Sequence, residues 1–368
     1  MSYCNMKESE KQSLNYRVLV LGGTGAMGTH LVNLLNRKGC QVIVTSRRIR
    51  SNFDNVTYVI GNAHEPTFLN SLLTLHFDVI VDFMVYNTDE FAQRYKTLLK
   101  SCGQYIYLSS SRVYADSSNL ITENSPRLLD VCMDKEFLAT DEYALTKARQ
   151  EDLLRQSGYS NYTIIRPYIT FSEIRFQLGV YEKENWLYRA LHGRTIVFSK
   201  DIADKYTTLT YGLNVAEGIA SLIGRSDAYS EAFHITANES HRWNEILQLY
   251  LHVIEKHMGK RPKVLILDKC PKLASPLGQY QVKYDRYYNR RFSNEKMNRF
   301  IDTTKFLPTL SGLEQCLETF IKSPAFRYIN WENEAKYDRW TYERASLKEL
   351  GNIKKTAKYL LYRYLLTK

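Results

Sequence analysis

The chain has 368 residues, of which 44% are hydrophobic, and a formal charge of +11. This length suits one large α/β domain with an elaboration, or two unequal domains. Because the basic residues are mixed with acidic ones, the sequence predicts no nucleic-acid face, and an anionic small substrate is the simpler explanation of the charge.

The cysteines and the apolar runs indicate the compartment. Six cysteines are scattered without any CxxC pair, which argues against zinc and against a disulfide framework. We therefore expect no metal and a cytoplasmic location. Residues 1–11 lack the apolar core of a secretory signal, and the longest apolar runs, such as Val79–Val85, are too short to span a bilayer. The sequence thus predicts no transmembrane segment.

Strands and helices alternate strictly in the first half of the chain. Strands are expected at Tyr16–Leu21, Gln41–Thr45, Val56–Ile60, Asp78–Phe83, Gln104–Ser109 and Tyr162–Arg166. Helices are expected at Ala26–Lys38, Pro66–Leu75, Asp89–Ser101 and Asp134–Gln156. This order predicts a Rossmann-type doubly wound parallel sheet over residues 16–170, preceded by a polar tail, residues 1–15.

The regular alternation ends near Phe171. Helices are expected at Trp186–His192, Asn214–Ile223 and Trp243–His257, and strands at Thr195–Phe198 and Ala232–Thr236. Such an order predicts a smaller mixed α/β lobe for the substrate, residues 171–330, from which the chain crosses back to the Rossmann domain. Residues 331–368 form a basic, aromatic-rich helical tail. This tail either packs on the domain or on a partner, or lies as a basic helix on anionic lipid.

A glycine-rich turn lies between the first strand and the first helix. It reads Gly22-Gly23-Thr24-Gly25-Ala26-Met27-Gly28, and it contains the spacing Gly-x-x-Gly-x-x-Gly. Glycines allow the backbone to approach a pyrophosphate, whose charge then lies at a helix N-terminus. We expect Gly22, Thr24, Gly25, Ala26, Met27 and Gly28 to bind a dinucleotide.

The end of the second strand indicates which dinucleotide is bound. A carboxylate there would accept a hydrogen bond from the ribose 2′-hydroxyl of NAD, but the sequence is Ser46-Arg47-Arg48. A hydroxyl and two guanidinium groups suit the 2′-phosphate of NADP, with NAD as the alternative. Asn62, after the third strand, is placed to contact the adenine.

A tyrosine and a lysine lie four residues apart on the expected long helix. Tyr143 and Lys147 share one helical face, so the ammonium can favour the phenolate. Such a tyrosine exchanges a proton with a hydroxyl group while NAD(P) exchanges the hydride. A serine from the run Ser109–Ser111 would hydrogen-bond the same substrate oxygen. These residues predict an oxidoreductase chemistry at a carbinol carbon.

Several blocks resemble the extended short-chain dehydrogenase/reductase family, in its NAD-dependent epimerase/dehydratase branch. The resemblance covers residues 16–322 and includes residues 105–114, Tyr-Ile-Tyr-Leu-Ser-Ser-Ser-Arg-Val-Tyr. It implies that Ser110, four residues before Tyr114, is the active-site serine, with Tyr143 and Lys147 as the Tyr-x-x-x-Lys pair. It further implies that Lys147 holds the nicotinamide ribose.

Two departures from the family pattern bear on the reaction. Nucleotide-sugar dehydratases follow the catalytic threonine with Asp-Glu, whereas this chain has Ser111-Arg112, so we expect no dehydration. The loop that usually supplies an arginine for the sugar-nucleotide diphosphate offers only Lys205, with Asn214 near the expected aspartate.

The leading interpretation is an NAD(P)-dependent epimerase or reductase of a nucleotide-activated sugar, acting as a homodimer. The sequence does not separate epimerase from reductase, since both need the same three side chains. One alternative is a reductase of a non-nucleotide ketone or aldehyde. Another is a Rossmann-fold binding protein for RNA or for a protein partner.

Overall fold

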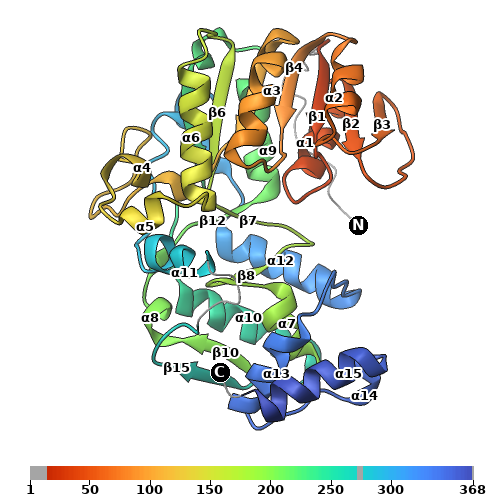
Figure 1. Ribbon diagram of the computed structural model, residues 1–368, viewed down its shortest axis with the longest axis vertical. Helices are drawn as coiled ribbons and strands as arrows, with labels where there is room; N and C mark the ends of the chain where they lie inside the picture. Colours follow the sequence, from red (N-terminus) through yellow and green to blue (C-terminus); the bar gives the residue numbers. More distant parts are fainter. Residues whose placement is uncertain (1–14, 272–276, 367–368) are drawn as a thin grey trace.

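Seven parallel strands form the largest sheet, in the order β13-β6-β5-β4-β1-β2-β3 (Figure 1). The computed structural model describes residues 15–271 and 277–366. The strands are β1 (Arg17–Leu21), β2 (Gln41–Ser46), β3 (Val56–Ile60), β4 (Phe77–Asp82), β5 (Cys102–Leu108), β6 (Tyr162–Pro167) and β13 (Glu231–Ile235). This sheet confirms the doubly wound fold expected from the alternation of strands and helices.

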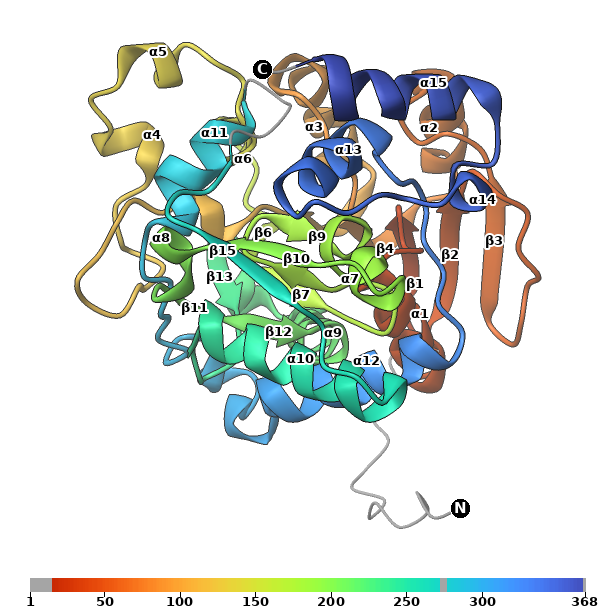
Figure 2. The ribbon, with the colours of Figure 1, turned by 90° about the horizontal axis from the view of Figure 1, so that it is seen from below.

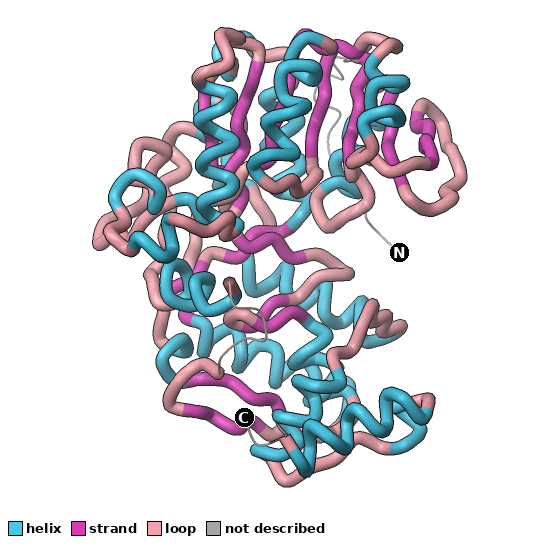
Figure 3. The backbone as a smooth tube through the Cα atoms, in the orientation of Figure 1, coloured by secondary structure: helices cyan, strands magenta, loops and turns pink. Residues whose placement is uncertain are grey.

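The central strands are apolar because helices cover both faces of the sheet (Figure 3). In β1, residues 18–21 are completely buried. One face is covered by α1 (Gly28–Arg37) and α9 (Gly212–Leu222). The other is covered by α2 (Pro66–Leu73), α3 (Thr88–Lys100) and α6 (Tyr143–Arg155).

The prediction of one long helix at Asp134–Gln156 is wrong, because the chain forms two helices there. The Asp134 carboxylate accepts the Phe137 N–H and begins α5 (Lys135–Leu138). The Glu142 carboxylate accepts the Ala144 N–H and begins α6. Each acidic side chain satisfies a free N–H group at a helix start, so the segment between them leaves the helix. As a result, Tyr143 is the first residue of α6 rather than a residue in mid-helix.

The second half of the chain builds a smaller lobe of helices and two-stranded sheets. The segment expected as a strand at Ala232–Thr236 instead joins the edge of the main sheet as β13, beside β6. The strands of the lobe are β7 (Ile169–Phe171), β8 (Gln177–Leu178), β9 (Tyr181–Glu182), β10 (Ile196–Ser199), β11 (Tyr206–Thr207), β12 (Leu209–Tyr211), β14 (His241–Arg242) and β15 (Val264–Leu267). Its helices are α7 (Lys183–Leu191), α8 (Lys200–Ala203), α10 (Trp243–Met258), α11 (Gly278–Gln281) and α12 (Thr309–Lys322), and α4 (Leu128–Val131) lies in the connection before α5.

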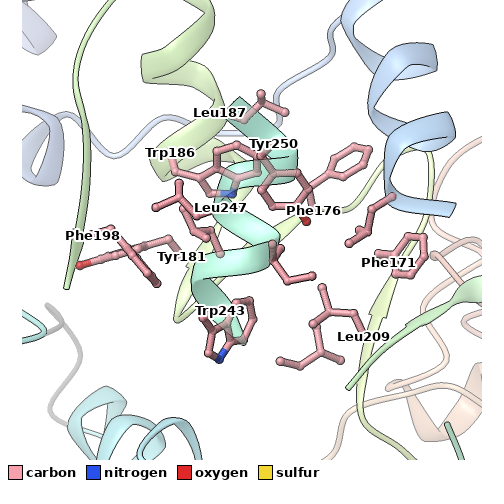
Figure 4. Packing of buried hydrophobic residues seen from close by; sticks show 14 of the residues in the cluster. Phe171, Phe176, Tyr181, Trp186, Leu187, Phe198, Leu209, Trp243, Leu247 and Tyr250 are labelled. Atoms are coloured by element: carbon pink, nitrogen blue, oxygen red, sulfur yellow. The ribbon is translucent and has the colours of Figure 1, made fainter. Parts of the chain in front are cut away.

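Aromatic side chains form the core of this lobe (Figure 4). Trp186 of α7 stacks on Tyr250 of α10, with ring centroids 4.4 Å apart and planes 16° apart. Trp243, at the start of α10, is also buried. Because aromatic side chains bury large areas, this stack fixes α7 against α10.

The C-terminal tail packs on the lobe, at the end of the molecule away from the main sheet (Figure 1). It contains α13 (Trp331–Trp340), α14 (Leu347–Leu350) and α15 (Ile353–Leu360), and a further helical turn continues α15 to Leu365. Seen from that end, α15 runs beside α13 along the outside (Figure 2). No helix within residues 15–271 and 277–366 is long and apolar enough to cross a membrane.

Candidate active site

Ser110, Tyr143 and Lys147 lie together on the wall of one cavity of about 460 Å³. Ser110 follows β5, and its hydroxyl accepts the Arg112 N–H at 3.2 Å. Tyr143 begins α6, and Lys147 follows one turn later on the same face. The parallel sheet places the end of β5 beside α6, and it thereby brings together residues that are more than thirty positions apart.

Only one hydroxyl of the serine run is directed to Tyr143. Ser109 donates to a Glu151 carboxylate oxygen at 2.5 Å, and Ser111 donates to the Arg166 carbonyl oxygen at 2.7 Å. Both hydroxyls therefore serve buried structural bonds. The Ser110 hydroxyl is hydrogen-bonded to Tyr143 instead.

Tyr143 lies in a mixed electrostatic environment. Burial raises the pKa of its phenol, and the Arg112 charge is the largest opposing influence, followed by the hydrogen bond from Ser110. The Arg112 guanidinium carbon lies 5.2 Å from the centre of the Tyr143 ring. Arg112 also pairs with Glu142, the residue that begins α6. The ion pair therefore holds a cation over the phenol.

Lys147 is buried beneath the cavity. Its Nζ donates to the Leu108 carbonyl oxygen at 2.7 Å and lies 5.9 Å from the centre of the Tyr143 ring. Burial lowers the pKa of Lys147 to about 8, although the charges of Asp82 and Glu151 oppose that effect. The Asp82 carboxylate accepts a hydrogen bond from the Tyr105 hydroxyl at 2.8 Å. Two buried carboxylates thus favour the ammonium form of Lys147.

The far wall of the cavity comes from the C-terminal lobe. It includes Arg175, Glu182, Gln281 and Arg286. Arg175 pairs with Glu182 at 2.9 Å, yet its side chain remains 39% exposed. Arg286, which is fully buried, donates through Nε to the Gly179 carbonyl oxygen at 2.8 Å. The cavity therefore has one accessible guanidinium group opposite Tyr143.

The two residues expected from the substrate loop do not line this cavity. Asn214 is buried and exchanges two hydrogen bonds of 3.2 Å with the backbone of Leu307. Lys205 lies between α8 and β11, where its carbonyl oxygen accepts the Trp243 N–H. Lys205 thus takes part in a backbone contact of the lobe, and Asn214 joins α9 to the segment before α12.

The glycine-rich turn has the geometry of a dinucleotide cradle. Gly22 has φ +70°, and a Cβ atom at Gly28 would lie 2.6 Å from the Gly23 carbonyl carbon. The chain therefore tolerates no side chain at either position. The Gly22 N–H donates to the Thr45 hydroxyl at 3.0 Å, which ties the turn to the end of β2. Because these positions carry no side chains, a pyrophosphate can approach the backbone before α1.

The residues expected at the adenosine end lie at the carboxyl ends of β2 and β3. The Ser46 hydroxyl donates to the Arg48 carbonyl oxygen at 2.8 Å and shapes a tight turn. Arg47 and Arg48 are exposed, and no carboxylate in the described part of the chain pairs with either. The Asn62 side chain accepts the His64 N–H and donates to Glu65, so it is already partnered locally.

Residues 18–229 match the NAD dependent epimerase/dehydratase family. The chain belongs to this family. It is therefore an enzyme of the NAD(P)-dependent extended short-chain dehydrogenase/reductase type. Within the described residues, no group of three or more His, Cys, Asp or Glu side chains is arranged to hold a metal ion.

Solved structures share the fold at low sequence identity. Epimerase Mth375 from Methanothermobacter thermautotrophicus is 17% identical, with a TM-score of 0.65, and the match covers 85% of this chain and 94% of that one. UDP-glucuronic acid 4-epimerase from Bacillus cereus, in complex with UDP-glucuronic acid and NAD, is 17% identical with a TM-score of 0.60. That match covers 83% of this chain and 99% of the epimerase.

A curated relative is the chloroplast stem-loop binding protein of 41 kDa b from Arabidopsis thaliana. It is 23% identical over 240 residues. The match covers 61% of this chain and 59% of the length of that relative.

Sequence reasoning did not identify the cavity residues Arg112, Arg175 and Arg286 as part of the site. The sequence indicates Arg112 only as a residue in the place of a dehydratase carboxylate. Arg175 follows β7 in an irregular segment, and Arg286 lies in a short helical segment after α11. No local spacing links these segments, so only the folded arrangement brings them to the cavity.

Proposed function

We propose that this enzyme is an epimerase or a reductase of a nucleotide-activated sugar, with NADP as its preferred cofactor. The observation that carries the proposal is the meeting of Ser110, Tyr143 and Lys147 on one cavity wall. In this proposal Tyr143 is the general acid/base, Ser110 orients the substrate oxygen, and Lys147 holds the nicotinamide ribose.

The three side chains have complementary tasks at a carbinol carbon. The phenolate of Tyr143 removes the hydroxyl proton, or the phenol returns it, while the Ser110 hydroxyl keeps the same oxygen within reach. The cation of Arg112 over the ring stabilises the phenolate while the proton is away. When bound, the nicotinamide supplies the hydride acceptor and donor. Burial of Tyr143 and Lys147 limits competition from water.

Two observations support a nucleotide sugar as the substrate. Solved structures with this fold contain UDP-glucuronic acid together with NAD, in MoeE5 and in the Bacillus cereus epimerase. In this chain, the partly exposed guanidinium of Arg175 lines the cavity and offers a cation to an anionic substrate. Arg175 would then replace the arginine that is missing from the substrate loop.

NADP is supported by the turn after β2. Arg47 and Arg48 have no carboxylate partner there, and two guanidinium groups suit a 2′-phosphate. NAD is the alternative cofactor. The expected homodimer and the expected cytoplasmic location also stay predictions.

Turnover of the purified full-length protein tests the proposed chemistry. UDP-, dTDP- and GDP-hexoses are offered separately, and products are resolved by proton NMR. We expect an altered stereocentre, or consumption of NADPH with a keto-sugar, and no 4-keto-6-deoxy product, because Ser111 and Arg112 supply no acid and base for dehydration. Mass spectrometry of the nucleotide that co-purifies identifies a retained cofactor, which favours an epimerase.

Replacement of the acid/base tests the role of Tyr143. Tyr143→Phe should lower turnover by at least about a hundredfold with little change in cofactor affinity. Tyr206→Phe is the matched control, since Tyr206 does not line the cavity. A Tyr143→Phe enzyme with wild-type turnover would refute this assignment.

A second candidate function is RNA binding in addition to catalysis. It is favoured by the chloroplast relative, which is named as a stem-loop binding protein. Mobility shift with an RNA hairpin at increasing salt tests it, because binding through phosphates weakens steeply with salt. If no shift occurs at low salt, the second function is excluded.

A further inference from the structure

Most carboxylates of the tail pair with buried arginines of the lobe. Buried Arg189 of α7 donates to Asp338 at 2.8 Å and to Glu334 at 3.0 Å. Arg194 donates to Glu349 at 2.9 Å. The remaining acidic side chains are paired as well, Glu343 with Arg189 and Glu332 with Lys358. All five carboxylates of residues 331–366 are therefore paired with basic side chains, four of them with the buried arginines Arg189 and Arg194.

The outer side of the tail is unusually apolar. Nine of the 22 exposed large apolar or aromatic side chains of the described residues lie within residues 340–366. They are Trp340, Tyr342, Leu347, Ile353, Leu360, Leu361, Tyr364, Leu365 and Leu366. Isolated exposed apolar residues are ordinary, but a group of this size on one short segment indicates a surface that is covered in use.

The apolar side chains of α15 and of the turn after it form one stripe. Ile353, Leu360, Leu361 and Tyr364 recur at the spacing of a single helix face, and each is at least 40% exposed. Tyr359 points the other way, where its hydroxyl donates to Asp338 at 2.6 Å. The helix is thus anchored by one face and presents its apolar stripe to the outside.

Exposed basic side chains lie on the same segment of the chain as this stripe. Lys348, Lys354 and Lys355 are exposed, and among the described residues no carboxylate pairs with any of them. Arg344 is also exposed. These four basic residues and the nine apolar ones above are the exposed side chains that we call the outer face of the tail, and together they combine apolar area with unpaired positive charge.

We propose that the outer face of the tail docks on an anionic lipid surface. Apolar and aromatic side chains would enter the boundary between head groups and acyl chains, and the lysines would contact the anionic head groups. A second copy of the chain fits this face less well, because a symmetric contact would bring the unpaired lysines toward one another. Lipid with negative charge complements both features at once.

Co-sedimentation of the full-length protein with vesicles tests the proposal. We expect binding to phosphatidylcholine vesicles that contain phosphatidylserine, weaker binding as salt rises, and no binding to phosphatidylcholine alone. Lys354→Gln with Lys355→Gln should weaken binding about thirtyfold, since each lysine near the surface contributes roughly a fivefold factor. Ile353→Ser with Leu361→Ser should abolish it.

Matched exposed residues elsewhere provide the controls. Lys38→Gln with Lys100→Gln removes two exposed lysines from the Rossmann domain, and Met133→Ser removes an exposed apolar side chain. Neither change should alter vesicle binding. The proposal is overturned if anionic vesicles do not bind, or if the control variants lose binding as much as the tail variants. It is also overturned if vesicles fail to bind while light scattering shows a dimer that Ile353→Ser with Leu361→Ser dissociates.

Discussion

At the scale of single residues, the cation that acts most strongly on Tyr143 is Arg112. The Tyr-x-x-x-Lys spacing places Lys147 on the same helical face, but the Lys147 ammonium is directed to the Leu108 carbonyl oxygen. Arg112 lies over the phenol ring instead and is fixed there by Glu142. A residue two positions beyond Ser110 therefore takes part in the electrostatics of Tyr143.

Arg112→Gln should raise the pH at which Tyr143 ionises, because it removes a cation close to the phenolate. The sign follows from charge: a nearby cation favours the ionised form, so its loss raises the pKa of Tyr143. The measurement is the ultraviolet absorbance of the phenolate during a pH titration of the protein with NADP bound. Subtracting the same titration of Tyr143→Phe isolates this tyrosine from the other 27.

Variants of two other arginines serve as comparisons in the titration of Tyr143. The charge of Arg175 also lowers the pKa of Tyr143, but less than the charge of Arg112 does, so Arg175→Gln should give a smaller rise. Arg225→Gln changes an exposed residue paired with Asp227 outside the cavity, and it should give none. If Arg112→Gln titrates like the wild type, Arg112 has no part in the ionisation of Tyr143.

At the scale of elements, the strand-helix alternation was sufficient to predict six of the seven strands of the sheet. The seventh, β13, comes from a segment expected in the lobe. Buried parallel strands are short apolar runs, and the glycine turn marks the junction of β1 and α1. The break between α5 and α6 was not predicted in the same way, because the low helix propensity of Thr140 and Asp141 is only a weak signal inside a longer helical pattern. It depends on Asp134 and Glu142 acting as caps, and an acidic residue within a helical pattern is equally compatible with a surface position.

The turn after β2 should determine cofactor choice. We expect NADP(H) to bind at least about tenfold more tightly than NAD(H), a difference of roughly 1.4 kcal/mol. Arg47→Ala with Arg48→Ala should reduce that preference, because the 2′-phosphate loses its guanidinium partners. Calorimetric titration with both dinucleotides measures the difference. Arg50→Ala is the control, since Arg50 lies over the Tyr58 ring instead. Equal affinities in the wild-type protein would contradict the assignment of NADP.

At the scale of the whole molecule, the sequence predicts the Rossmann side of the cavity better than the lobe side. Ser110, Tyr143 and Lys147 lie at recognisable places after a predicted strand or on a predicted helix. Arg175 and Arg286 instead come from two segments without such a pattern, more than a hundred residues apart. The packing of the tail on the lobe also depends on residues that are far apart in the sequence. It depends on Arg189 and Arg194 meeting carboxylates more than 130 positions later, and no local pattern encodes such a pairing.

The buried ion pairs of the tail should make stability depend on pH through Glu334. Burial raises the pKa of Glu334 from its ordinary value of 4.5 to about 7, although Arg189 and Arg194 oppose this. One of its carboxylate oxygens has no hydrogen-bond partner. The folded protein therefore binds more protons here than the unfolded chain between these two pH values. By linkage, the contribution of Glu334 is fully favourable below pH 4.5 and is lost as pH rises to 7.

Glu334→Gln should remove most of this loss of stability with rising pH. Glutamine keeps a hydrogen-bond acceptor for Arg189 and has no proton to lose, so the free energy of unfolding should fall less between pH 5 and pH 8 than in the wild type. The difference between the two proteins should be on the order of 3 kcal/mol at most, since each pKa unit corresponds to about 1.4 kcal/mol. Urea unfolding at both pH values measures it, with Glu314→Gln on α12 as the control. If wild type and Glu334→Gln show the same pH dependence, Glu334 is already ionised at pH 5 and the ion pairs with Arg189 and Arg194 outweigh its burial.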